Sequence, residues 1–280
     1  MTAQSYHQPA PAGMFRPAVG NLPNRVPDAT PAFWLIKLLA VTMGETAADY
    51  LAVNLGLGLT ATSLIMTAIL AITLVLQFAQ KRYVPWAYWL AVVLISVVGT
   101  LITDNLVDNF GVPLLTTTIV FTVALIATFA VWYASERTLS IHTIFTTRRE
   151  VFYWLAILFT FSLGTSVGDL LAEQFDLGYL ATGLIFGAVI AVITFGYYGL
   201  ALNSIVAFWL AYILTRPLGA SFGDVLSQPV EYGGFGFGTT YTSLLFLGGI
   251  VATVIYLSLS DRSGLAAAPA TAKSGPLLGG

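Results

Sequence analysis

The stretch FWLIKLLAVTMGETAAD, residues 33 to 49, occurs in the chain in four related forms. The other three are YWLAVVLISVVGTLITD at 88–104, YWLAILFTFSLGTSVGD at 153–169 and FWLAYILTRPLGASFGD at 208–224. Every copy has an aromatic residue followed by Trp, then a Gly ten residues after the Trp and an Asp five residues after the Gly. Four matches in one frame indicate an internal repeat produced by duplication.

The composition around this repeat is that of an integral membrane protein. The 280 residues are 57% hydrophobic and 9% charged, with a mean hydropathy of +0.84, whereas a soluble domain carries roughly 25% charged residues. The net charge of -2 gives no reason to expect a nucleic-acid partner. There is no Cys, and the two His residues lie in polar segments. We therefore expect no disulfide, no zinc or haem site built on these side chains, and no cofactor.

Each repeat holds two apolar stretches of about 20 residues, the length that crosses a bilayer core of roughly 30 Å. We predict an all-α membrane protein of eight transmembrane helices, arranged as four tandem two-helix repeats in the same orientation and pseudo-symmetric about an axis along the membrane normal. The predicted repeats are 31–80, 86–135, 151–200 and 204–260, in a single membrane domain at 31–260. The tails, 1–30 and 261–280, are expected to be disordered. The predicted spans lie near 33 to 53, 59 to 79, 86 to 107, 113 to 134, 151 to 172, 179 to 199, 204 to 226 and 239 to 259.

Basic residues indicate the orientation. Most Lys and Arg residues lie in the tails or between repeats, namely Arg16, Arg25, Lys81, Arg82, Arg137, Arg148, Arg149, Arg262 and Lys273. The charged residues in the turns within repeats are all acidic, namely Asp108, Glu173, Asp176 and Glu231. By the positive-inside rule, both termini are predicted to be cytoplasmic. The four Trp residues are expected to anchor the interface there, and Lys37 is expected to snorkel to it.

The fourfold Trp–Gly–Asp unit resembles a bacterial inner-membrane family described as four tandem copies of a repeat of unknown function. Its members are labelled as uncharacterised membrane-anchored proteins. The resemblance covers about residues 31 to 260. It implies a multi-pass protein of the bacterial inner membrane, and it implies no activity, substrate or cofactor.

The repeated acids are the candidate functional groups. A helical rise of about 1.5 Å per residue places each Asp about 22 Å from its Trp, within the outer part of the hydrocarbon layer. An ionisable group in a span costs about 2.5 to 3.5 kcal/mol at the helix centre, so something must compensate these carboxylates. Glu45 adds an acid one turn before Asp49, and two such carboxylates coexist only with a shared proton or cation. The predicted ion-binding or proton-relay residues are Glu45, Asp49, Asp104, Asp169 and Asp224.

Other residues complete the predicted site. Oxygen ligands without Cys or His favour H+, Na+, Mg2+ or Mn2+, and Glu45 with Asp49 is a candidate metal pair. Thr46, Thr100 and Thr165 are predicted to line the site. Arg216 lies about 10 Å deep and needs an anion, most plausibly Glu45 or an Asp of a neighbouring unit, and Pro217 is expected to kink its helix. Small residues four apart predict close helix packing at Gly44, Gly99, Gly164 and Gly219.

These patterns favour a transporter or channel for a small cation, not an enzyme, with the lipid bilayer and the cation as its partners. The alternative is a scaffold or sensor, in which each Asp caps the second helix of its own hairpin near the hydroxyls of Thr60, Thr116, Thr182 and Thr239. An intramembrane aspartyl protease is a remote alternative, because its Gly-x-Gly-Asp signature is missing from TSVGD and ASFGD. The sequence leaves the ion, the direction of transport and the oligomeric state open.

Overall fold

A computed structural model describes residues 23–266, with side chains as far as Leu259; the remaining predicted tail residues lie outside this range. The described part is helical and contains no strand. Its long helices match the eight predicted spans: α1 Pro31–Asp49, α2 Leu59–Phe78, α3 Pro85–Asp104, α4 Leu114–Glu136, α5 Thr147–Asp169, α6 Gly178–Gly199, α7 Ser204–Ser227 and α8 Gly238–Ala266. Two short 3-10 helices lie at Ile141–Thr143 and Val230–Tyr232.

Local sequence explains where these helices begin and end. Thr30 caps α1 by accepting a hydrogen bond from the Phe33 N–H, and Pro31 occupies the first helical position. The turn before α2 requires a left-handed residue, which Gly58 supplies at φ 75°. After the repeated Asp, α1, α3 and α5 each continue into one π-helical turn, at Tyr50–Asn54, Asn105–Asn109 and Leu170–Gln174. In the fourth repeat no π-helical turn follows Asp224. The helix α7 extends to Ser227 and contains Pro217.

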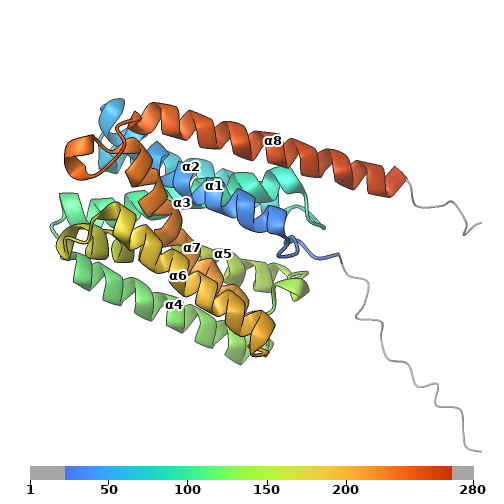
Figure 1. Cartoon of the computed structure of the whole chain (residues 1–280). Coiled ribbons are helices and arrows are strands. Elements are labelled where there is room, and N and C mark those ends of the chain that lie inside the picture. The colour runs from blue at the N-terminus through green and yellow to red at the C-terminus, as the bar shows by residue number, and fades with distance from the viewer. Residues whose placement is uncertain (1–22, 267–280) are drawn as a thin grey trace, which may run out of the picture.

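The helices form an inner ring and an outer layer. The inner ring is α1, α3, α5 and α7, in which each helix packs against two neighbours and α7 closes the ring against α1. Each outer helix packs chiefly against the inner helix of the following repeat: α2 on α3, α4 on α5, α6 on α7, and α8 on α1. In Figure 1, α8 lies along one edge beside α1, and α4 lies along the opposite edge. The repeats are therefore interlocked, and none is a separate hairpin.

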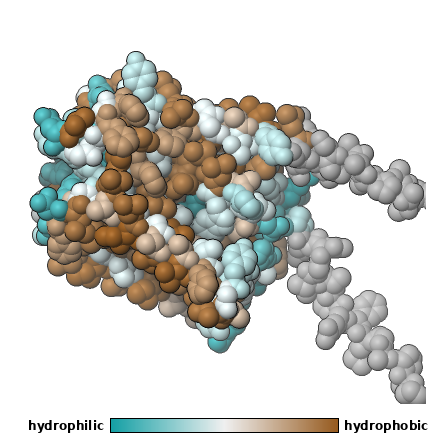
Figure 2. Space-filling model, viewed as in Figure 1, coloured by the Kyte–Doolittle hydropathy of each residue, from teal (hydrophilic) through white to brown (hydrophobic). Residues whose placement is uncertain are grey.

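The outer layer is the surface expected to contact lipid. It exposes many large apolar side chains, such as those of Leu64, Val123, Val192 and Leu244. Figure 2 shows apolar surface along the side of the bundle, with hydrophilic residues gathered toward its ends. Seven of the described helices are long and apolar enough to cross a membrane. The exception is α1, which carries Lys37, Glu45 and Asp49 and lies between α3 and α7. These features are those of a multi-pass membrane protein.

The aromatic–Trp pairs form a buried layer at the end of the bundle where the inner helices begin, which we call the tail end. The rings of Tyr88 and Tyr153 lie 6.4 Å apart, and their hydroxyl groups share a hydrogen bond of 2.6 Å. Trp89, Trp154 and Trp209 are buried among these rings. The prediction of an interfacial anchor is therefore wrong for these three Trp residues, because their rings pack against other rings inside the bundle. Trp34 is only partly buried.

The predicted boundaries of the tails also need correction. Arg25 forms an ion pair of 2.6 Å with Glu150, the Asn24 amide donates to the carbonyl of Ile141, and Val26 is buried. This part of the N-terminal tail is held against the connection before α5 by charge and hydrogen bonds. At the other terminus, α8 continues past residue 260 to Ala266.

Candidate functional site

The glycines of the repeat set the register of the inner ring. A Cβ atom added to Gly164 would lie 2.2 Å from Arg216 Cγ, and one added to Gly219 would lie 2.5 Å from Val41 Cγ1. Gly44 and Gly99 approach Ser96 and Phe161 of the next inner helix in the same way. Each glycine therefore faces the residue seven positions after the Trp of the following repeat. This is the close packing predicted for Gly44, Gly99, Gly164 and Gly219, and it makes the inner helices parallel and in register.

That register brings equivalent positions together around one buried cation. Arg216 is fully buried, and its Nη2 forms an ion pair of 2.7 Å with Glu45 Oε2. The same nitrogen donates to Thr165 Oγ1 at 2.7 Å and to Thr100 Oγ1, and Thr100 donates to Glu45 Oε2 at 3.2 Å. The predicted ion pair between Arg216 and Glu45 is present. Glu45, Thr100 and Thr165 each follow the glycine of their repeat.

Arg216 is only partly satisfied by these contacts. Its Nε and Nη1 are buried and have no hydrogen-bond partner among the described residues. A guanidinium group offers five N–H donors in a planar fork, and a locked structural pair commonly uses two nitrogens on one carboxylate. The pair with Glu45 uses one nitrogen. Arg216 therefore retains donors for a second acceptor.

The four repeated Asp residues lie on the opposite side of this pair from the tail end. Each of them is within electrostatic range of Glu45, and Asp169 is also within range of Arg216. They lie at the ends of their helices in the first three repeats and three residues before the end of α7 in the fourth. The tertiary structure thus gathers the predicted acids around one axis; these are Glu45, Asp49, Asp104, Asp169 and Asp224.

These Asp side chains do not cap neighbouring helices. Within the part of the chain that the structure describes, none of the four makes a side-chain hydrogen bond or ion pair. The first turns of α2, α4 and α6 have no side-chain cap. The nearby hydroxyl groups have other partners, since Thr60 donates to Asn105 and Thr62 to the carbonyl of Gly58. The capping alternative is not what the structure shows.

Two further expectations need correction. Thr46 was predicted to line the site, but its hydroxyl group donates within α1 and accepts from Ser243 of α8 at 2.7 Å. Thr46 faces α8 because it lies one residue, about 100° of helix, beyond Glu45.

Lys37 does not snorkel to the surface, because it is fully buried. Its Nζ donates to the carbonyl of Tyr212 at 3.0 Å and to Thr215 Oγ1. The same atom lies 4.0 Å from the centre of the Tyr212 ring. Its helix is in the inner ring, so the nearest polar groups belong to α7.

A metal site is not assembled from these residues. Among residues 23–259, no group of three or more His, Cys, Asp or Glu side chains is placed to hold a metal ion. The Glu45 carboxylate forms an ion pair with Arg216 instead. The described residues therefore do not support the suggested metal pair of Glu45 and Asp49.

Sequence reasoning missed the role of Phe161 and Tyr212. Phe161 lies between the two buried cations, with its ring centre 5.6 Å from Lys37 Nζ and 5.5 Å from Arg216 Cζ. A signal was present, because Phe161 and Arg216 occupy the same position of the repeat, as do Lys37 and Tyr212. Aligning the four copies by column predicts which side chains share a layer.

Comparison with known families agrees with this repeat. The chain matches the family described as Repeat of Unknown Function (DUF347) four times, at residues 32–83, 87–138, 152–201 and 207–263. The chain belongs to the DUF347 family. The family resemblance predicted from the sequence is thus confirmed, and the four DUF347 repeats coincide with the four interlocked helix pairs. No curated protein and no solved structure gave a match.

Proposed function

We propose that this DUF347 protein moves a monovalent cation, H+ or Na+, across the membrane along the axis of the inner ring. Glu45 and the four Asp residues form the binding site, and Arg216 is the counter-ion that releases and recaptures Glu45. The observation that carries the proposal is an imbalance of charge. Four Asp carboxylates lie within electrostatic range of Glu45, which is paired with one cation, and these four have no hydrogen-bond or ion-pair partner in the described part of the chain.

The helix termini add to this imbalance. The carboxyl ends of the parallel inner helices meet near the Asp residues, and the carboxyl end of a helix carries a partial negative charge. Acids at this position are destabilised by the helix dipoles as well as by one another. Protons or a bound cation would relieve both effects.

The oxygens of the Asp carboxylates are not completely sealed by the described residues. Their oxygens have no partner, yet none is among the fully enclosed polar atoms of the described residues. Each oxygen therefore keeps some surface that a water molecule or an ion can touch. A purely structural acid in a lipid-facing bundle would be sealed or paired.

The contacts also support the predicted symmetry. Equivalent glycines meet equivalent residues around the inner ring, and α8 packs on α1 as α2 packs on α3. We infer four repeats related by a pseudo-fourfold axis along the membrane normal, with α1 as the eighth span. Both ends of the described chain lie at the same end of the bundle (Figure 1), as an even number of spans requires. By the positive-inside rule, the basic connections support a cytoplasmic location for that end, in a protein of the bacterial inner membrane.

Flux through reconstituted protein tests the proposal. Purified protein in liposomes is given a K+ diffusion potential, and H+ uptake is followed with enclosed pyranine and Na+ uptake with radioactive sodium. We expect one of the two ions to enter at least tenfold faster than in protein-free liposomes. Glu45→Gln and Asp49→Asn, which keep side-chain size and remove charge, should each reduce that rate at least tenfold.

The matched control is Asp176→Asn. Asp176 is exposed in the turn before α6 and has φ 55°, a conformation that Asn also adopts readily. This variant should keep the wild-type rate. Wild-type rates in both Glu45→Gln and Asp49→Asn would disprove the assigned site. No flux of either ion with folded wild-type protein would instead favour the scaffold role.

A further inference from the structure

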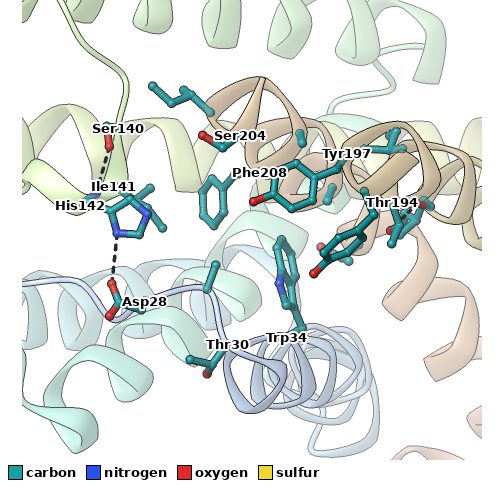
Figure 3. Close-up of a pocket in the computed structure, with 18 of the residues that line it drawn as sticks. Asp28, Thr30, Trp34, Ser140, Ile141, His142, Thr194, Tyr197, Ser204 and Phe208 are labelled. Atoms are coloured by element: carbon teal, nitrogen blue, oxygen red, sulfur yellow. Dashed lines mark hydrogen bonds and ion pairs between the residues drawn. The ribbon is translucent and has the colours of Figure 1, made fainter. Parts of the chain in front are cut away.

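One cavity lies at the tail end, between α1, α6, α7 and the connection before α5. It has a volume of about 580 Å³. Asp28 and His142 line one side of it; their side chains are exposed and lie 3.1 Å apart (Figure 3). Trp34, Tyr197 and Phe208 line its walls (Figure 3). The cavity therefore has exposed polar side chains at the connection before α5.

The inner end of this cavity reaches the buried polar groups of the ring. Thr215 lines the cavity and is nearly buried. Its hydroxyl group accepts a hydrogen bond from Lys37. The next residue in α7 is Arg216, which is bonded to Glu45. One hydroxyl group thus separates the cavity from Lys37.

A second cavity does not reach the buried cations. It has a volume of about 370 Å³, lies between α4, α5 and α7, and is lined by apolar side chains such as those of Phe129, Trp209 and Ile213. Neither Lys37 nor a residue of the Arg216 cluster lines it, and such a groove suits lipid chains.

We propose that the larger cavity is a water-filled vestibule, the entrance of the cation path on the tail side, and that Thr215 and Lys37 form its inner end. The proposal rests on the transport function inferred above. The cavity is large enough for many water molecules, each of which needs polar partners, and Asp28, Thr194 and Thr215 supply them. The vestibule would complete a route from the tail end to Glu45, with the Asp residues beyond.

Thiol labelling tests the vestibule directly, because the chain contains no Cys. Thr215→Cys is compared with Thr160→Cys, which occupies the same position of the third repeat, is fully buried and does not line this cavity. In liposomes, the water-soluble cationic reagent methanethiosulfonate ethyltrimethylammonium should modify Thr215→Cys at least tenfold faster than Thr160→Cys. After unfolding in detergent, both should react equally. If Thr215→Cys fails to fold, Ala211→Cys replaces it, with Ala156→Cys as its control.

Two results would overturn the proposal. Equal, slow labelling of the two variants, or labelling of Thr215→Cys by a lipid-soluble maleimide alone, would show a cavity filled by lipid. An unchanged ion flux after complete labelling of Thr215→Cys would remove the cavity from the path. We expect labelling to reduce the flux at least fivefold, since the attached group fills the inner end of the cavity. Absence of flux in the wild type would instead reject the transport function, and the labelling rates would still show whether the cavity holds water.

Discussion

Replacing Arg216 with Met should lower the free energy of unfolding by about 3–5 kcal/mol, the range measured when one partner of a buried ion pair is removed. Met has a similar length but no charge, so Glu45 loses its 2.7 Å ion pair. Thr100 and Thr165 lose the nitrogen to which they are bonded. Unfolding in mixed micelles, followed by circular dichroism against the fraction of denaturing detergent, measures the change.

The double variant Glu45→Gln with Arg216→Met is the control for the predicted loss of stability. Removing both charges eliminates the uncompensated carboxylate, so most of the lost stability should return. The double variant should nevertheless carry no ion flux. Our account of the pair would be wrong if Arg216→Met alone cost less than about 1 kcal/mol, well below the expected range.

Gly164→Ala should destabilise the protein by about 1–3 kcal/mol, as overpacking of a tight contact does. The added methyl group would lie 2.2 Å from Arg216 Cγ and 2.6 Å from its Cβ, atoms near the backbone that cannot move aside easily. The two helices must separate, which also displaces Arg216 from Glu45. We therefore expect both a lower melting temperature in micelles and a large loss of ion flux.

Gly187→Ala is a matched control on α6. There the new methyl group would meet Leu218 Cδ1 at 3.7 Å, an ordinary van der Waals contact. Because Ala favours a helix over Gly by about 1 kcal/mol, this variant should be neutral or slightly more stable. Equal melting temperatures for Gly164→Ala and Gly187→Ala would show that the inner-ring contact is looser than the structure indicates.

The number and limits of the helices were predictable from the sequence because apolar length and turn chemistry are local properties. The span predicted near 59 to 79 is the helix Leu59–Phe78, for example. The pairing of Arg216 was also predictable, since a buried guanidinium needs an anion and Glu45 is the acid that departs from the repeat. Both conclusions follow from the cost of placing polar groups in lipid.

The neighbours of each helix were not predictable in this way. Trp89 was expected at the membrane interface and Lys37 at the cytoplasmic surface, yet both are buried. The inner helices are on the whole less apolar than the outer ones. The hydropathy of a whole segment still does not show which side of a helix faces protein and which faces lipid. Thr46 was misplaced for the same reason, because its direction depends on where α8 packs.

The sequence by itself determined four copies of a two-helix unit, the positions of their close-packing glycines and the acids that need a counter-charge. Only the tertiary structure decided that each outer helix packs on the next repeat, that Thr100 and Thr165 meet Arg216, and that a cavity reaches Thr215. The physical reason is the range of the forces involved. Backbone hydrogen bonding and transfer to lipid act on each segment alone, whereas the closing of the ring depends on contacts between residues more than a hundred positions apart, such as Glu45 and Arg216.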